Sequence, residues 1–161
     1  GDILMQDIFA LDKDMNSSDL NLNLTNLGKK TLMKTLPLLF ENKLIGKKQD
    51  ESKVTYANKF MPEDRKINFY NSSDDVYNHI RAHGPKPGSW FTYKGERIKI
   101  IKAKKINKSG ESSTILDKDF TIACKDGAIL PLLIQREGKK IVSLDDFLRG
   151  FTFVIQDKLN A

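Results

Sequence analysis

The chain has 161 residues and a formal net charge of +6, and 39% of its residues are hydrophobic. That is enough apolar material for one domain, or for a small domain with a fragment of another. No run of about 18 apolar residues is present, so we predict no membrane span, and the first residues do not resemble a signal peptide. Cys124 is the only cysteine, which favours a reducing, cytoplasmic location and a small buried side chain.

The basic excess is confined to the second part of the chain. Residues 1–63 hold nine lysines and nine acidic residues, whereas residues 64–161 hold 18 basic and 12 acidic ones. Such asymmetry suggests that the C-terminal part meets a polyanion. An ordinary solvated basic surface is the alternative.

The first 45 residues resemble one α/β unit. The apolar run Asp2–Leu11 predicts a strand. Ser17 or Ser18 is expected to cap a long helix, whose leucines recur at helical spacing from Leu20 onward. One strand and one helix cannot build a core, so we expect residues 1–45 to be the end of a larger domain. The polar residues 46–63 then form a linker.

A second helix is expected to start at Ser72, with Asp74 and Asp75 at the positive end of its dipole. It should end before Pro85, because proline disfavours helical geometry in the preceding residue. His79 and His83 have a spacing that can bind a metal, but no third ligand is nearby. We therefore predict no metal site.

The following segment predicts a basic β-hairpin. Residues 90–93 and 97–106 form its strands, across the turn at 94–96. In the second strand the alternation of basic and apolar residues slips by one position near Ile100 and Ile101. A strand tolerates this slip only if a residue bulges out, and such bulges bend strands around small barrels.

Short β-segments fill the remaining chain. We expect strands near residues 114–116, at 120–124 and 128–135, and at 151–155, with a short helix beginning at Ser143. Asp126 and Gly127 suit the positive φ values of a tight hairpin turn. The order predicts a small barrel of the oligonucleotide/oligosaccharide-binding (OB) type over residues 64–161.

Basic side chains cluster on the hairpin. Residues 94–108 carry seven positive charges against the single acid Glu96. Lysine and arginine contacts to phosphates give affinity but little sequence selectivity. The candidates for contacting an RNA backbone are Lys86, Lys94, Arg97, Lys99, Lys102, Lys104, Lys105, Lys108, Lys139 and Lys140.

Aromatic residues offer a second way to bind RNA. Tyr56, Trp90, Phe91 and Tyr93 can stack on bases, although core packing is favoured for Trp90 and Phe91.

Several motifs, in this order, resemble the C-terminal half of methionyl-tRNA formyltransferases. They include Thr55-Tyr56-Ala57-Asn58-Lys59, Lys66-Ile67-Asn68-Phe69, Ile80-Arg81-Ala82, Pro87-Gly88-Ser89-Trp90 and Gln135-Arg136-Glu137-Gly138-Lys139-Lys140. One departure is Gly84-Pro85-Lys86-Pro87, where the family usually has Asn-Pro-Trp-Pro, so no role of that tryptophan is transferred.

The resemblance implies the architecture and the reaction. The fold class would be α+β overall. Residues 1–45 would be the β-strand/α-helix tail of a Rossmann-like formyltransferase domain, 46–63 a linker, and 64–161 an OB-like tRNA-binding barrel. The parent enzyme would transfer a formyl group from 10-formyltetrahydrofolate to methionyl-initiator-tRNA, as a cytoplasmic monomer. Its catalytic Asn, His and Asp are expected upstream of Gly1. This implies that the chain alone is inactive and binds no cofactor, metal or membrane.

Two alternatives remain open from the residues. The first is the C-terminal half of a nucleotide-sugar formyltransferase, although a small substrate needs no extended basic surface. The second is a stand-alone RNA-binding barrel, although the apolar segment Asp2–Leu11 would then lack its parent sheet. Through that segment, a fragment cut from a longer chain could self-associate.

Overall fold

The computed structural model describes residues 1–159. They form two compact units, unit 1 (Gly1–Lys59) and unit 2 (from Phe60 onward). No helix among the described residues is both long enough and apolar enough to cross a membrane.

Unit 1 is built on the long helix α1 (Ser17–Phe40), which confirms the predicted helix. Its cap is Asn16 rather than a serine, because the Asn16 side chain accepts hydrogen bonds from the backbone N–H groups of Ser18 and Asp19. The Asp19 carboxylate accepts in return from the Asn16 N–H at 3.3 Å. This reciprocal capping box fixes where the helix begins.

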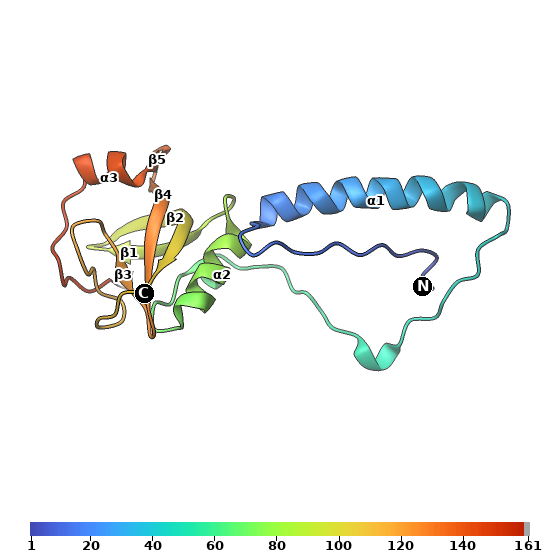
Figure 1. The fold of residues 1–161 in the computed structure, drawn as a ribbon, viewed down its shortest axis with the longest axis horizontal. Coiled ribbons are helices and arrows are strands. Elements are labelled where there is room, and N and C mark those ends of the chain that lie inside the picture. Colours follow the sequence, from blue (N-terminus) through green and yellow to red (C-terminus); the bar gives the residue numbers. More distant parts are fainter. Residues whose placement is uncertain (160–161) are drawn as a thin grey trace. The chain divides into compact units, whose positions relative to one another are not determined.

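The strand predicted for Asp2–Leu11 is wrong. The segment runs extended beside α1 (Figure 1), and its only ladder contact within residues 1–159 is an isolated bridge between Ile3 and Lys47. A strand needs a partner along its length, and unit 1 supplies none. The segment is instead attached to the helix by contacts such as the Thr35 hydroxyl, which donates to the Met5 sulfur at 3.3 Å. A 3₁₀ turn, η1 (Glu51–Lys53), follows later in unit 1.

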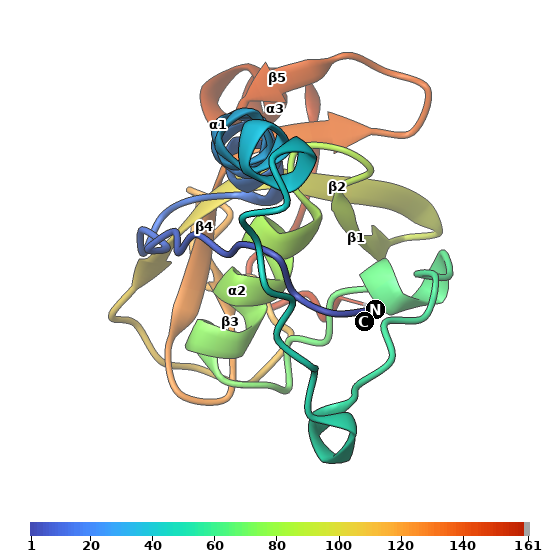
Figure 2. The ribbon, with the colours of Figure 1, turned by 90° about the vertical axis from the view of Figure 1, so that its right-hand side faces the viewer.

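Unit 2 contains a mixed set of helices and strands around an antiparallel sheet (Figure 2). The elements are η2 (Glu63–Arg65), α2 (Ser73–His83), β1 (Ser89–Tyr93), β2 (Glu96–Ile106), β3 (Ile122–Ala123), β4 (Ala128–Arg136), β5 (Ile141–Ser143) and α3 (Leu144–Gly150). The strand order is β1-β2-β4-β3, and β5 pairs with β4. Helix α2 packs mainly against β2.

The sheet is open, so the closed barrel expected from the sequence is not observed. Within residues 1–159, the free side of β1 pairs only through an isolated bridge between Lys66 and Trp90. Residues 151–155 form no strand, and the Val154 N–H donates to the Tyr93 hydroxyl at 3.3 Å. Residues 114–116 contribute only the isolated bridges of Thr114 and Ile115.

The β1–β2 hairpin has a two-residue turn, one residue shorter than predicted. Tyr93 pairs with Glu96, and Lys94 and Gly95 have φ values of 48° and 81°. Two successive positive φ values match a type I′ turn, whose twist suits antiparallel strands.

The predicted positive φ at Asp126-Gly127 is wrong, since neither residue has one. Glycine suits position 127 for another reason. A Cβ there would lie 2.8 Å from the Ser73 hydroxyl oxygen, so the residue permits close approach to the start of α2.

The predicted bulge in β2 is confirmed. Ile100 pairs with Ile134 and Lys102 with Leu133, which leaves Ile101 as the extra residue. A second shift follows directly, because Ala103 pairs with Pro131. Beyond the bulge, Lys102 and Lys104 are exposed, whereas Ile101 and Ala103 are buried.

The core of unit 2 lies beneath the sheet and is rich in phenylalanine. Phe120 is fully buried, and its ring lies 4.9 Å from that of Phe153 and 5.4 Å from that of Phe147 in α3. Phe91 is also fully buried, so the prediction that it packs in the core is confirmed. Cys124 is buried as expected, and burial raises the pKa of its thiol to about 12, which makes it unreactive near neutral pH.

Candidate nucleic-acid interface

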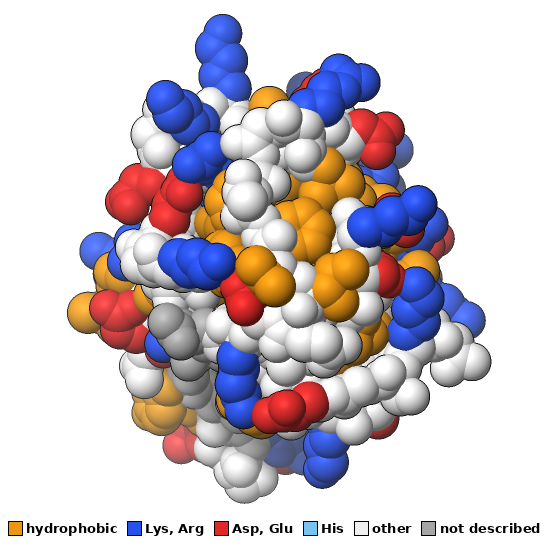
Figure 3. All heavy atoms as spheres, turned by 90° about the vertical axis from the view of Figure 1, so that its left-hand side faces the viewer, with side chains coloured by type: hydrophobic (Ala, Val, Ile, Leu, Met, Phe, Trp, Pro, Cys, Tyr) orange, Lys and Arg blue, Asp and Glu red, His pale blue; other side chains and the backbone are white. Residues whose placement is uncertain are grey.

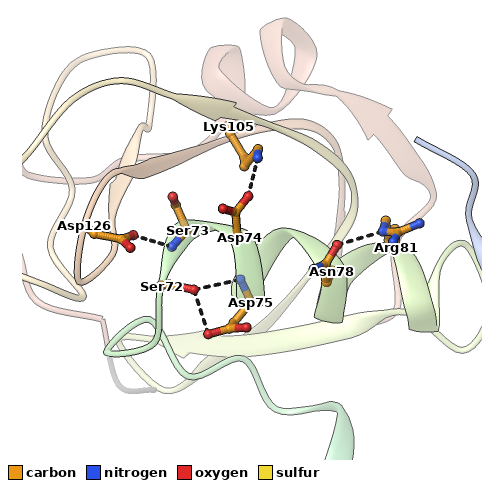
Figure 4. A network of polar contacts seen from close by, with 8 residues as sticks. All are labelled: Ser72, Ser73, Asp74, Asp75, Asn78, Arg81, Lys105 and Asp126. Carbon is orange, nitrogen blue, oxygen red and sulfur yellow. Dashed lines mark hydrogen bonds and ion pairs between the residues drawn. The ribbon is translucent and has the colours of Figure 1, made fainter. Parts of the chain in front are cut away.

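The ten basic candidates separate into those that form ion pairs and those that do not. Lys105 belongs to the first group, since its ammonium pairs with Asp74 in the first turn of α2 (Figure 4). The same turn is held by Ser72, which accepts from the Asp75 N–H at 3.0 Å, and by Asp126, which accepts from the Ser73 N–H at 2.7 Å. Lys105 therefore joins β2 to α2, and its charge is already compensated.

Lys94 has a similar structural role at the β1–β2 turn. Its ammonium lies 3.1 Å from Asp157, which also accepts a 2.5 Å hydrogen bond from the Tyr93 hydroxyl. The Tyr93 and Lys94 hydrogen bonds lower the pKa of Asp157. This arrangement attaches the C-terminal segment to the hairpin.

Lys108 pairs with Asp117 at 2.6 Å, and this partner raises the pKa of Lys108. Because Asp117 also accepts from the backbone N–H groups of Asp119 and Thr121, the pair organises the loop before β3.

The other candidates form no ion pair within residues 1–159. They lie on β2, on the turn before β1, and on the turn between β4 and β5. They are Lys86, Arg97, Lys99, Lys102, Lys104, Lys139 and Lys140. These seven side chains are available to an anionic ligand without breaking an existing pair.

Arg97 is stacked on the indole of Trp90, with its guanidinium carbon 4.1 Å from the ring centroid. The indole is 6% exposed, and its Nε1–H donates to the Pro62 carbonyl at 3.1 Å. Trp90 is therefore buried as predicted, although it lies outside the main cluster of core residues, which contains Phe91. Arg97, which is half-buried, covers the ring.

A pocket of about 250 Å³ opens beside Arg97 and Lys99. Its remaining lining comes from the end of β4 and the following turn, namely Gln135, Arg136, Glu137 and Gly138. Arg136 makes a two-point pair with Glu96, at 2.6 and 2.8 Å, which raises the pKa of its guanidinium. Among the basic lining residues, Arg97 and Lys99 are the two without an acidic partner.

Two features of this surface were missed by sequence reasoning. Gln135 was noted only as part of a motif, because its place beside Lys99 depends on the register of β2 and β4. The second feature is hydrophobic: at the end of unit 2 that carries α3, apolar side chains gather, with both basic and acidic side chains around them (Figure 3). Exposed apolar residues of the C-terminal part include Ile141, Val154 and Ile155.

The two histidines of α2 are in contact, with ring centroids 4.6 Å apart and ring planes tilted by 55°. The Nδ1 of His83 lies 3.0 Å from the His79 carbonyl oxygen, and the Nε2 atoms of both rings are buried without a hydrogen-bond partner. Residues 1–159 contain no group of three or more potential metal-ligating side chains. The pair therefore packs against its surroundings, and Phe60 meets His83 edge-on at 5.2 Å.

Acid should destabilise unit 2 through His79. Burial lowers the pKa of His79 and His83 lowers it further, although a hydrogen bond to the Arg65 backbone opposes both effects. The unfolded state then binds more protons than the folded state, so the free energy of unfolding falls as the pH drops below about 6.5. Urea unfolding at about pH 7.5 and about pH 5.5 measures this effect. Between these two pH values, His79→Gln should lose less free energy of unfolding than the unmodified chain. Equal losses would contradict this prediction.

Comparison with known proteins assigns the family. Unit 2 is a small mixed α/β domain on an open antiparallel sheet, and residues 59–152 match the family described as formyl transferase, C-terminal domain. The chain belongs to this family, which confirms the resemblance found in the sequence.

Individual relatives agree with this assignment. The methionyl-tRNA formyltransferase of Rickettsia bellii is 34% identical over 161 residues, which cover 99% of this chain and 52% of that protein. The chain thus spans about half the length of the curated relatives it matches.

Two solved structures are also similar. The N-formyltransferase of Helicobacter canadensis, in complex with folinic acid and dTDP-3-aminofucose, is 26% identical with a TM-score of 0.63, over 84% of this chain and 50% of that one. HypX of Aquifex aeolicus, at 16% identity and a TM-score of 0.69, matches 100% of this chain and 32% of its own, which shows a shared fold.

Proposed function

We propose that this chain is the C-terminal half of a methionyl-tRNA formyltransferase and that unit 2 binds methionyl-initiator-tRNA. The observation that carries the proposal is the row of unpaired, exposed lysines on β2. Lys102 and Lys104 point outward beyond the bulge, while the apolar residues between them are buried. Such a row suits the phosphate backbone of RNA.

The proposed division of labour follows the sequence. Residues 1–45 form the tail of a Rossmann-like formyltransferase domain, residues 46–63 a linker, and residues 64–161 the tRNA-binding domain. The bulge in β2 and the strand order β1-β2-β4-β3 support an OB-like relationship for that domain. In this proposal the whole protein is a cytoplasmic monomer, and the 161-residue chain can self-associate through the apolar residues of unit 1.

The chemistry belongs to the whole protein in this proposal. Formyl transfer from 10-formyltetrahydrofolate to the methionyl amino group needs a general base and donors for the oxyanion of the tetrahedral intermediate. We assign these roles to an Asn, a His and an Asp outside the 161 residues. The lysines of unit 2 would hold the tRNA while the other half carries out the transfer.

The chain alone is therefore expected to have no transferase activity and to bind no folate. The measurement is formylation of methionyl-initiator-tRNA by the purified 161-residue chain with 10-formyltetrahydrofolate. Turnover above the rate without protein would contradict the assignment of the catalytic residues.

Reversing two charges on β2 should weaken tRNA binding. Lys102→Glu/Lys104→Glu is expected to reduce the affinity for tRNA about tenfold at low salt, and by a similar factor for different tRNAs, because phosphate contacts carry little sequence information. The matched control is Lys118→Glu/Lys125→Glu, which makes the same charge change at exposed loop positions. Filter binding measures both. Equal affinities for the two double variants would contradict a specific role for β2.

A nucleotide-sugar formyltransferase is the second candidate, favoured by the similarity to the Helicobacter canadensis protein. The unpaired lysines favour the hypothesis that the substrate is a tRNA, because a small sugar nucleotide needs no extended basic surface. Competition distinguishes the two: excess dTDP-sugar should leave tRNA binding unchanged if the first proposal holds. A stand-alone RNA-binding module would bind tRNA equally well. The similarity favours half of a larger enzyme instead, because the matching relatives are about twice as long as this chain.

A further inference from the structure

The pocket beside Arg97 has the size and charge of a site for one phosphate group. Its volume of about 250 Å³ is below the roughly 300–1,000 Å³ of pockets that enclose a whole small-molecule ligand. It is also polar, and the two lining residues Arg97 and Lys99 have no acidic partner within residues 1–159. Glu137 is the one acidic residue that lines it, and its side chain is exposed.

Strand register brings the lining together. Lys99 of β2 pairs with Trp90 of β1 on one side and with Gln135 of β4 on the other. Directly paired residues on neighbouring antiparallel strands share one face of the sheet. Trp90, Lys99 and Gln135 therefore form a row across three strands.

Each member of this row is held in place by other contacts. The Lys99 stem lies close to Gly88, where an added Cβ would be 3.4 Å from the lysine Cδ. The Gln135 amide donates to the Lys139 carbonyl at 2.8 Å, which leaves its second N–H for a ligand. The turn at Gly138, with φ of 68°, leads to Lys139 and Lys140, which line a separate pocket that shares Arg136 with this one.

The Arg97–Trp90 stack adds a flat surface beside the phosphate position. Trp90 supports one face of the guanidinium at 4.1 Å. Arginine planes stack on unpaired RNA bases, and every base has a face that can be stacked. A nucleotide with its phosphate at Lys99 and Gln135 could place its base on the outer face of Arg97.

We propose that Arg97, Lys99 and Gln135 form a subsite for a single RNA nucleotide, in which the phosphodiester enters the pocket and the base stacks on Arg97. This inference rests on the proposed tRNA-binding function and adds a defined contact to it. This subsite has a different role from Lys102 and Lys104 beyond the bulge, which in the proposed function contact only the phosphate backbone of the RNA.

Trp90 is the only tryptophan of the chain, so its fluorescence reports directly on Arg97. Titration of the 161-residue chain with a tRNA transcript should change the Trp90 emission. Lys99→Glu should weaken binding about tenfold through lost phosphate attraction. Arg97→Lys keeps the charge but removes the planar guanidinium. It should abolish the emission change and weaken tRNA binding about fivefold. The salt dependence of binding should stay unchanged, because the charge is the same.

Control variants separate this subsite from the general basic surface. Lys102→Glu/Lys104→Glu should weaken binding but keep the emission change at saturation, and Lys118→Glu should alter neither. Circular dichroism checks that each variant is folded. Lys99 is half-exposed. Lys99→Gln is a milder second variant, which should lose less tRNA affinity than Lys99→Glu.

Three outcomes would overturn the inference. If tRNA binds with unchanged Trp90 emission and Lys99→Glu binds like the unmodified chain, the subsite is wrong while the tRNA-binding proposal stands. If no tRNA binds at low salt, both fail. If a nucleoside diphosphate at micromolar concentration reproduces the emission change, the pocket belongs to a free nucleotide rather than to RNA.

Discussion

Replacing Phe120 with alanine is expected to lower the free energy of unfolding of unit 2 by about 3–5 kcal/mol. The ring is fully buried and contacts those of Phe147 in α3 and Phe153 in the C-terminal segment. Its removal leaves a cavity where three parts of the chain meet. Phe120 has a positive φ of 58°, a backbone conformation that is equally unfavourable for alanine. The loss of unfolding free energy therefore measures the removal of the ring and not a change in backbone strain.

Urea unfolding followed by Trp90 fluorescence measures this effect. The matched control is Tyr56→Ala, because Tyr56 is an aromatic residue that is 87% exposed. Its replacement should change the unfolding free energy by less than about 0.5 kcal/mol. A loss below about 1 kcal/mol for Phe120→Ala would contradict its place at the centre of the core.

Gly84→Ala is the second change with a large expected effect, a loss of about 1–3 kcal/mol. An added Cβ would lie 3.0 Å from the backbone oxygen of Ile101 and 3.1 Å from that of Ile80. Neither atom belongs to a flexible side chain, so either α2 or the bulge of β2 must shift. Displacement of the bulge would also move Lys102, so tRNA affinity should fall together with stability.

Thermal unfolding tests this prediction. For a domain of this size, 1 kcal/mol corresponds to roughly 4–8 °C in the melting temperature. Gly150→Ala is the control, since an added Cβ there meets nothing within 4 Å. It should leave the melting temperature unchanged or raise it slightly. A melting temperature of Gly84→Ala equal to that of Gly150→Ala would show that α2 and β2 are not in close contact.

Local features of the fold were predictable from the sequence. The phase slip near Ile100 indicated the bulge, because a strand has a period of two. The Ser72 cap of α2 followed from side-chain chemistry and was confirmed by its hydrogen bond to the Asp75 N–H.

Pairing between distant segments was not predictable. The strand at Asp2–Leu11 was expected from its apolar run, but a strand also needs a partner, and unit 1 supplies only a single bridge at Ile3. Barrel closure was not predictable for the same reason: residues 151–155 are mostly apolar but pair with no strand, and the Val154 N–H donates to the Tyr93 hydroxyl.

The candidate interface was predictable only as a cluster of charges. Which lysines are already paired depends on acids far away in the sequence: Asp157 for Lys94, Asp74 for Lys105 and Asp117 for Lys108. Composition cannot reveal these partners. The tertiary structure reduces ten equivalent candidates to the seven without an acidic partner.

The salt dependence of tRNA affinity tests the binding role of these seven side chains most directly. Filter binding of the 161-residue chain to a tRNA transcript would be measured between about 50 and 200 mM salt. Each phosphate contact should contribute about 0.7–0.9 to the slope of log affinity against log salt, so seven contacts predict a slope between about −5 and −6. Lys102→Glu/Lys104→Glu should make it shallower by about 2. A slope near zero, or no binding at low salt, would contradict the proposal that this basic surface holds tRNA.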